Sequence, residues 1–434
     1  QRRAMLEAMG LRAEDLFADV PSALRCGPLN LPEPLSEQQV RGRLAELAAK
    51  NHVELTLFLG GGFYDHFIPA AVYALTGRGE FYTAYTPYQP EVSQGTLQAI
   101  YEYQSMICRL TEMEAANASL YDGGTALYEA MMMALRRTRR RKILIDDSVN
   151  PIYRVMIQSH TRNLNIQLVE TANADGLANR RALLDELDDD TAAVLVQNPN
   201  FFGCIDDYTD LAEAAHDKGA LLICSVYPIS LGILKTPGAM GADIVTGEGQ
   251  SLGLPMSFGG PYLGFLATRK EHVRQMPGRI VGRTVDAEGR PGFVLTLQAR
   301  EQHIRRDRAT SNICSNEALC ALTALVYLSL LGKEGLREVA QLCADKASYA
   351  YRKLTDIPGV GPRFHAKWVF NEMVLDLPCD AADVIGRLIE KGFAAGFPLS
   401  RYYRGMDQSI LIAVTEKRTK QEIDMLAAAL EDVL

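Results

Sequence analysis

Short apolar runs alternate with amphipathic helical segments from about residue 60 to about residue 330. Residues 142–146, 192–197 and 220–224 are short, strongly apolar runs, as is typical of buried strands. Between the last two runs, Tyr208 to Lys218 has helical spacing and ends at Gly219, which suits a helix C-cap. Strands that alternate with helices in this way predict an α/β fold with a mostly parallel sheet, covered on both faces.

The pattern changes after about residue 332. We expect a long helix over 336–354 and then a strand, a helix, a strand and a closing helix over 367–376, 381–391, 409–414 and 418–433. This order indicates a small α+β domain. Before residue 60, prolines precede Ser36-Glu-Gln-Gln, which reads as a helix start. The predicted organisation is an N-terminal helical arm (1–60), a large domain (61–331) and a small C-terminal α+β domain (332–434).

The longest apolar run, Ala318 to Leu331, spans about 14 residues and includes Thr323, Tyr327 and Ser329. A membrane-spanning helix needs roughly 20 apolar residues. We therefore expect a buried helix and no membrane partner.

Composition narrows the possible functions. The 434 residues are 47% hydrophobic and carry a net charge of −8, which disfavours a nucleic-acid partner. The basic run 136–142 follows a predicted helix, where cations stabilise the negative end of the helix dipole. Eight scattered cysteines, with no C-x-x-C pair, indicate reduced thiols and no zinc site. Without a charged and then apolar leader, we expect a cytoplasmic protein.

Three polar motifs are candidates for chemistry. Gly60-Gly-Gly62 does not satisfy G-x-G-x-x-G, because Asp65 stands where the third glycine should be, so a nicotinamide fold is disfavoured. Asp122-Gly-Gly-Thr125 precedes a helix, where backbone N–H groups suit a phosphate, although Asp122 as a simple cap is an equal alternative. Asn198 and Asn200 follow a strand and are expected to face a cleft, unless they only form the turn.

Two further stretches suggest a site or an interface. Tyr82, Tyr85, Tyr88 and Gln89 cluster between prolines, and aromatic side chains with polar tips favour interfaces. The second stretch, residues 300–314, is dense in charge and ends in a predicted turn at Thr310-Ser-Asn, where hydroxyl and N–H groups could meet an anion.

Together these stretches resemble the P-protein of the glycine cleavage system. The resemblance is carried by long motifs from the N-terminal helices to the end of the chain, and the length matches the alpha subunit where this enzyme is split in two. The motifs are the stretches 85–95, 117–125, 247–261, 276–282 and 300–314.

The resemblance implies a fold and an activity. The fold is the pyridoxal-phosphate-dependent transferase fold type I, with a seven-stranded, mostly parallel sheet and a small C-terminal domain. The activity is that of glycine dehydrogenase (aminomethyl-transferring), in which glycine is decarboxylated and its aminomethyl group passes to the lipoyl arm of the H-protein. The implied assembly is a cytoplasmic heterotetramer with two alpha and two beta subunits.

This chain departs from the family where the cofactor would be held. Pyridoxal phosphate needs a lysine amine for its Schiff base and an acidic partner for its ring nitrogen. By the resemblance, Gln250 stands at the lysine position, and an amide cannot form an imine. Tyr227 stands near the aspartate position, and a phenol with a pKa of about 10 is no counter-ion. We therefore expect a vestigial site, with the pyridoxal phosphate on the beta subunit.

What remains is a contribution to the beta subunit's active site across the interface. By the resemblance, Thr310, Ser311 and Asn312 reach towards the cofactor phosphate held by beta. Tyr85, Tyr88 and Gln89 line the partner's pocket. Arg300 or Arg305 meets a substrate carboxylate, which the forked guanidinium binds well.

Two alternatives stay open at this point. The chain could be a self-sufficient pyridoxal-phosphate decarboxylase or transaminase that uses Lys235 or Lys270, between which no other lysine occurs. It could also be a scaffold that binds the beta subunit or the H-protein and contributes nothing to the site.

Overall fold

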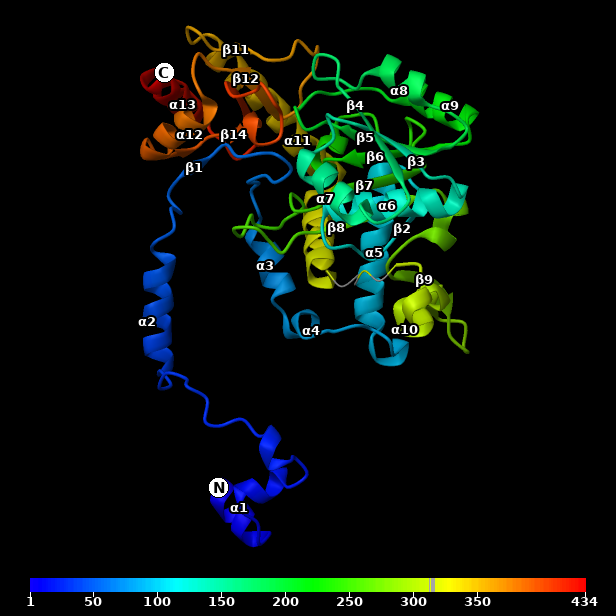
Figure 1. Cartoon of the computed structure of the whole chain (residues 1–434), viewed down its shortest axis with the longest axis vertical. Coiled ribbons are helices and arrows are strands. Elements are labelled where there is room, and N and C mark those ends of the chain that lie inside the picture. The colour runs from blue at the N-terminus through cyan, green and yellow to red at the C-terminus, as the bar shows by residue number, and fades with distance from the viewer. Residues whose placement is uncertain (312, 314–316) are drawn as a thin grey trace. The chain divides into compact units, whose positions relative to one another are not determined.

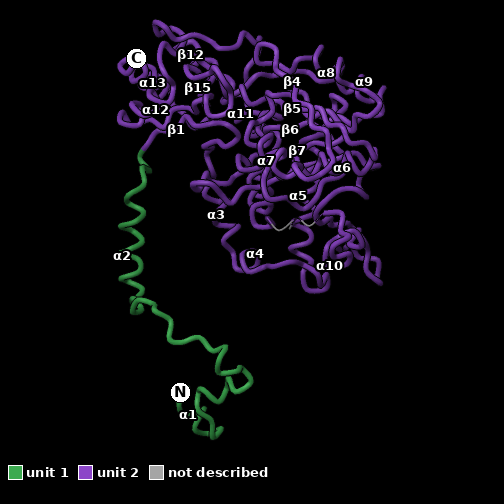
Figure 2. Tube along the Cα trace, in the orientation of Figure 1, with its two compact units in different colours: residues 1–54 green, residues 55–434 purple. Residues whose placement is uncertain are grey.

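A computed structural model of the chain describes residues 1–311, 313 and 317–434. These residues divide into two compact units, 1–54 and 55–434 (Figure 2). The first unit contains α1 (Arg2–Ala8) and α2 (Glu37–Ala48), and none of its residues is buried. The helix start predicted at Ser36 is confirmed, because the backbone N–H and side chain of Gln39 form a reciprocal capping box with Ser36.

A seven-stranded sheet forms the centre of the second unit (Figure 1). Its order is β2-β8-β7-β6-β5-β3-β4, and β8 alone runs antiparallel to its neighbours on both sides. The predicted mostly parallel sheet is therefore confirmed. The strands are β2 (Ala115–Ala116), β3 (Lys142–Asp146), β4 (Gln167–Thr171), β5 (Thr191–Asn198), β6 (Leu221–Val226), β7 (Ile244–Glu248) and β8 (Gly264–Thr268).

Side chains that alternate along the central strands cover both faces of this sheet. Leu144, Val194, Leu222 and Val245 belong to one core cluster with residues of α5, α9 and α11. Their neighbours Ile143, Leu195, Ile223 and Ile244 pack with α6 and α7 on the other face. This alternation buries both faces, as expected for a parallel sheet. The helices are α5 (Gln94–Thr111), α6 (Gly123–Thr138), α7 (Pro151–Thr161), α8 (Arg180–Glu186), α9 (Thr209–Asp217) and α11 (Ala318–Thr355).

A four-stranded antiparallel sheet, in the order β11-β12-β15-β14, forms a second core with α12, α13 and the end of α11. Strand β12 is shorter than predicted, since residues 368–370 instead pair with the turn after β5, where Phe370 N donates to Gly203 O (3.0 Å). The elements are β11 (Gly361–Pro362), β12 (Glu372–Asp376), β14 (Phe397–Pro398), β15 (Ser409–Ala413), α12 (Ala381–Glu390) and α13 (Lys420–Val433).

Helix α11 is 38 residues long and, by length and composition alone, could cross a membrane. Its first part, however, buries Cys320, Ala324 and Tyr327 in the core, as the sequence predicts for this apolar run. Gly332 interrupts the helix with non-helical angles (φ 59°, ψ −170°). The predicted domain boundaries at residues 60 and 331 stay predictions.

The turn after β5 generates a test of this packing. Gly203 has φ +82°, and a Cβ there would lie 2.1 Å from the backbone oxygen of Glu372 in β12. We expect Gly203→Ala to lower the free energy of unfolding by several kcal/mol, since a positive φ costs about 1 kcal/mol and the clash adds to it. Gly289→Ala is the control, because its φ is +78° and nothing lies within 4 Å. If urea denaturation showed equal losses of unfolding free energy for the two variants, the result would contradict this packing.

Candidate functional site

Gln250, which the resemblance puts at the lysine position, lies just after β7 and is 1% exposed. Its Oε1 accepts from the backbone N–H of Tyr64 (2.9 Å). Its Nε2 donates to the carbonyl oxygens of Tyr64 (3.1 Å) and Leu254 (2.8 Å). Both ends of the amide are therefore engaged inside the protein. The side chain holds the Tyr64 segment against the sheet.

Tyr227, near the expected aspartate position, directly follows β6 and is also buried. Its hydroxyl is hydrogen-bonded with Nε2 of His66, whose Nδ1 lies 2.6 Å from Oε2 of Glu416. Its ring lies 4.3 Å from the ring of Tyr64, measured between centroids. Burial raises the pKa of the Tyr227 phenol well above its ordinary value. Tyr227 itself therefore offers no anion to pair with a pyridinium.

The glycine cluster 60–62 makes room for a buried carboxylate. Glu372 accepts from Gly61 N (2.6 Å) and from the hydroxyl of Tyr64 (2.8 Å). A Cβ at Gly60 would lie 2.1 Å from Glu372 Oε1, so only glycine permits this approach. The cluster therefore joins β12 to the Tyr64 segment.

The residues at this edge do not fit pyridoxal phosphate. Its chemistry needs an amine and an acid, and Gln250 and Tyr227 supply neither. Lys235 forms an ion pair with Asp207 (2.9 Å) at the surface. Lys270 follows the end of β8 that pairs with Ile244, the first residue of β7. Because Gln250 follows the last residue of β7, the two residues lie at opposite ends of the strands. Neither lysine supports the self-sufficient alternative.

His66 and Cys343, both buried, and the half-buried Glu416 form a group whose donor atoms all lie within 4.8 Å of one another. It is the one such group found in the described part of the chain. Cys343 Sγ donates to Glu416 Oε2 (3.6 Å), and Glu416 Oε1 accepts from Phe67 N (2.7 Å). These hydrogen bonds account for the group without a metal ion.

The expectation that Asn198 and Asn200 face a cleft is wrong. Both are buried, and their side chains hold the turn after β5. Asn198 exchanges two hydrogen bonds with the backbone of Asp206. Asn200 donates to Gly176 O (2.6 Å) and accepts from Phe202 N and Cys204 N. Turn formation, the simpler alternative, accounts for both residues.

The structure brings several predicted interface residues together. Tyr88, Arg300 and Ser311 line one small pocket. Tyr88 packs beside His303, with ring centroids 5.3 Å apart, and Ser311 donates to Glu129 in α6 (2.7 Å). Of the other predicted interface residues, Gln89 is exposed beside Tyr88, and Asn312 lies outside the described residues.

A second group of predicted residues lines a cationic groove of about 390 Å³. Arg300, Arg305 and Thr310 share it with Arg274 and Arg308, and no acidic residue is among its described lining. Two backbone carbonyls, those of Met276 and Gly278, already accept from the Arg300 guanidinium. Arg305 is exposed, and among the described residues its guanidinium donates from Nε alone, to Ala299 O (3.1 Å). Arg305 is therefore freer than Arg300 to bind a carboxylate.

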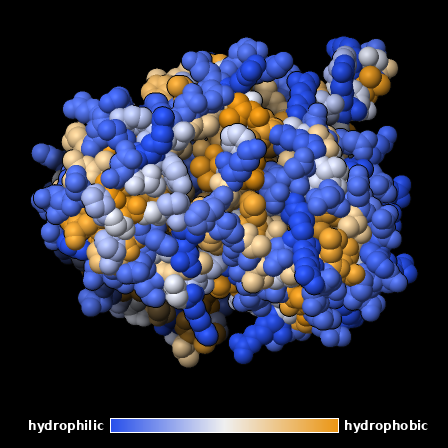
Figure 3. Space-filling view, turned by 90° about the horizontal axis from the view of Figure 1, so that it is seen from above, coloured by the Kyte–Doolittle hydropathy of each residue, from blue (hydrophilic) through white to orange (hydrophobic). Residues whose placement is uncertain are grey.

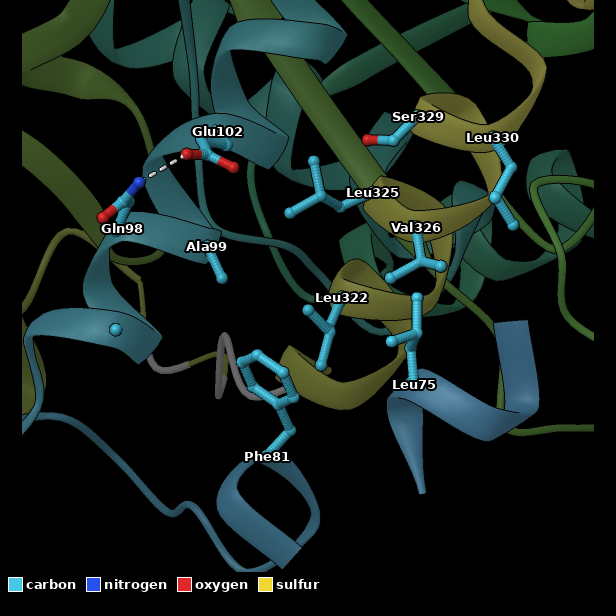
Figure 4. A pocket seen from close by; sticks show the side chains of 11 residues that line it. Leu75, Phe81, Gln98, Ala99, Glu102, Leu322, Leu325, Val326, Ser329 and Leu330 are labelled. Carbon is cyan, nitrogen blue, oxygen red and sulfur yellow. Dashed lines mark hydrogen bonds between the residues drawn. The ribbon is translucent and has the colours of Figure 1, made fainter. Parts of the chain in front are cut away.

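Tyr85 lies on an apolar surface next to a larger groove. It is 79% exposed and lines a pocket with Phe81, Leu319 and Leu322. The adjoining groove, of about 430 Å³, is drawn in Figure 4, where leucine and valine side chains of α11 face Leu75 and Phe81. Glu102 and Gln98 at its edge are hydrogen-bonded to each other (2.7 Å). The face in Figure 3, by contrast, shows apolar residues in separate groups on a mostly hydrophilic surface.

No sequence pattern predicted four residues of this site: Tyr64, His66, Glu372 and Glu416. Their contacts join segments far apart along the chain; the Tyr64–Glu372 hydrogen bond spans 308 residues. Gly60-Gly-Gly62 was the one local signal, because consecutive glycines often mark a close approach to another segment.

The buried Glu372 generates a pH prediction. Burial raises its pKa from 4.5 to about 7, so between these values the folded chain holds a proton that the unfolded chain releases. Stability contributed by this group therefore falls as pH rises from about 4.5 to about 7. We expect Glu372→Gln to gain stability relative to the wild type from about pH 5 to about pH 7.5, by up to about 3 kcal/mol.

Urea denaturation at several pH values would measure this difference. Glu422→Gln is the control. The pKa of Glu422 is lowered, partly by hydrogen bonds from Thr419, so the difference in unfolding free energy between this variant and the wild type should stay constant over this pH range. A flat difference for Glu372→Gln as well would contradict the prediction.

Known proteins match this chain over its whole length. It is 58% identical over 433 residues to the probable glycine dehydrogenase (decarboxylating) subunit 1 of Geotalea uraniireducens (strain Rf4), covering 100% of this chain and 98% of that relative. A crystal structure of glycine decarboxylase (P-protein) of the glycine cleavage system, in inhibitor-bound form, is 48% identical with a TM-score of 0.94. That match covers 100% of this chain and 98% of the other.

More distant structures share only the fold. Glutamate decarboxylase of Lactobacillus brevis CGMCC 1306 is 14% identical with a TM-score of 0.68, covering 95% of this chain and 96% of that one. Such neighbours confirm the predicted fold type I of pyridoxal-phosphate-dependent enzymes. The sequence profile of the glycine cleavage system P-protein matches residues 1–430. The chain therefore belongs to the glycine cleavage system P-protein family.

Proposed function

We propose that this chain is the alpha-type subunit of a two-chain glycine decarboxylase. Together with a second subunit it decarboxylates glycine and passes the aminomethyl group to the lipoyl arm of the H-protein. The chain is 58% identical over its whole length to a relative named subunit 1. This similarity supports the enzyme activity and the existence of a second subunit. The observation that carries the division of labour is Gln250, whose buried amide cannot form an imine and is already engaged with Tyr64.

The cofactor is then held by the second subunit, where pyridoxal phosphate supplies the electron sink for loss of carbon dioxide. This chain contributes side chains from its surface. Thr310, Ser311 and Asn312 are proposed to approach the phosphate, and Tyr85, Tyr88 and Gln89 to line the pocket. Arg305 is the better candidate for the glycine carboxylate, because the guanidinium of Arg300 is committed to the Met276 and Gly278 carbonyls.

The second subunit has an apolar surface to cover. The groove lined by Leu75, Phe81, Leu322, Val326 and Leu330 (Figure 4) continues into the surface around Tyr85. A contiguous apolar patch of this kind marks an interaction site, since monomeric proteins seldom expose one. Two such pairs form the proposed heterotetramer.

Co-purification with a second-subunit partner, followed by exchange of labelled carbon dioxide into glycine, tests the proposal. We expect exchange only when both chains and pyridoxal phosphate are present. Exchange by this chain alone would favour the self-sufficient alternative. Full exchange by the second subunit alone would leave this chain a scaffold.

The groove predicts where assembly can be broken. Leu330 is 47% exposed at its edge, so Leu330→Glu should leave the isolated chain folded but bury a charge at the interface. We expect the affinity for the second subunit to fall at least about tenfold. Leu184→Glu, at a leucine that is 45% exposed on α8, is the matched control and should bind normally. Equal affinities in sedimentation or light scattering would place the interface elsewhere.

The proposed contributions to the site predict a loss of turnover without a loss of assembly. We expect Thr310→Ala and Tyr85→Ala to lower turnover of the assembled enzyme about 10- to 100-fold, the scale of one lost hydrogen bond to a charged group. Tyr402→Ala, at a tyrosine that is 38% exposed in the C-terminal part, is the control. Unchanged turnover in both test variants would contradict the roles proposed for Thr310 and Tyr85.

A further inference from the structure

Glu248 is the last residue of β7, and its carboxylate is buried at the beginning of α6. Oε2 accepts from the backbone N–H of Gly123, the first residue of that helix (2.9 Å). Oε1 accepts from the backbone N–H groups of Gln250 (2.9 Å) and Leu263 (3.0 Å). Three backbone donors from three separate segments therefore converge on one carboxylate.

The first turn of α6 is shaped around this carboxylate. A Cβ at Gly123 would lie 3.0 Å from the Cβ of Glu248 and 2.6 Å from the hydroxyl of Tyr153. At Gly124 it would lie 2.8 Å from the Tyr153 ring. The two glycines thus admit Glu248 and Tyr153 to the space in front of the helix. Asp122 caps the same turn, accepting from Thr125 N (2.8 Å).

The N-terminus of a helix is where a phosphate group would bind, because its backbone N–H groups are unsatisfied and the helix dipole favours negative charge. Here a carboxyl group of the protein already occupies that position. Burial raises the pKa of Glu248 to about 7, so the group carries its negative charge above that pH. We infer that Glu248 is a built-in anion that takes the place of a phosphate at the start of α6 and keeps phosphorylated ligands out of this chain.

The inference stands on contacts within this chain and does not depend on a second subunit. It adds a second barrier to the one made by Gln250. Restoring a lysine at position 250 would leave the phosphate position occupied. Removing the Glu248 carboxylate, by contrast, would uncover an anion site lined by the N–H groups of Gly123, Gln250 and Leu263.

The test is rescue of a truncated variant by small anions. Glu248→Ala should lose several degrees in Tm, since three buried N–H groups lose their acceptor. Inorganic phosphate or acetate, titrated against chloride at constant ionic strength, should restore much of this loss in a saturable way. Leu375→Ala, which opens an apolar cavity in the other core, controls for general salt stabilisation. The wild type should show no saturable shift.

Two results would overturn the inference. One is a phosphate or acetate shift in Glu248→Ala no larger than that in Leu375→Ala. The other is saturable phosphate binding by the wild type, which would mean that the helix end is already open.

If Glu248→Ala does not fold, Glu248→Gln keeps the side-chain volume but faces at least one backbone N–H with a second donor. Hydrogen exchange should then become faster in a peptide containing Gly123 and stay unchanged over β5, and unchanged exchange at Gly123 would also overturn the inference.

Discussion

Two hydrogen bonds join the side-chain amide of Gln250 to the backbone of Tyr64, and the carboxyl edge of the central sheet is organised around them. They hold Tyr64 where its ring lies against Tyr227 and its hydroxyl donates to Glu372. Because Glu372 belongs to β12, the same residue links the seven-stranded sheet to the four-stranded one. Burying Gln250, Tyr64 and Glu372 is tolerable only because each of them finds a partner inside the chain. An edge that enzymes of this fold use for a cofactor is thereby filled by the protein itself.

In the proposed function, these contacts leave the chemistry of this chain to its surface. With Gln250, Tyr227 and Glu248 all engaged, the residues free to act are those of the exposed tyrosine segment and the arginine-lined groove. Arg305 and Tyr85 remain exposed, whereas Arg300 is held by backbone carbonyls. The apolar groove that adjoins Tyr85 is the surface that, in the proposed function, a second polypeptide covers.

The central strands were predictable from sequence because each is a local apolar run; β3 begins and ends at the predicted residues. The mostly parallel order followed from the helices between them. The length of strand β12 was overestimated, because residues 368–370 pair with a distant turn that the local pattern does not reveal. The same limit applies to the site. Gln250 could be identified by resemblance, but its partner Tyr64 lies 186 residues away, and no local pattern predicts such a contact. Asn198 and Asn200 were assigned to a cleft because the rule for strand ends does not say which polar residues the turn itself needs.

Borohydride reduction of the assembled enzyme with pyridoxal phosphate, followed by peptide mass mapping, tests the central claim most directly. Reduction fixes the cofactor to whichever amine holds it. The account predicts the label on a single lysine of the second subunit and none on any peptide of this chain. A labelled lysine in this chain, at Lys235, Lys270 or elsewhere, would contradict it.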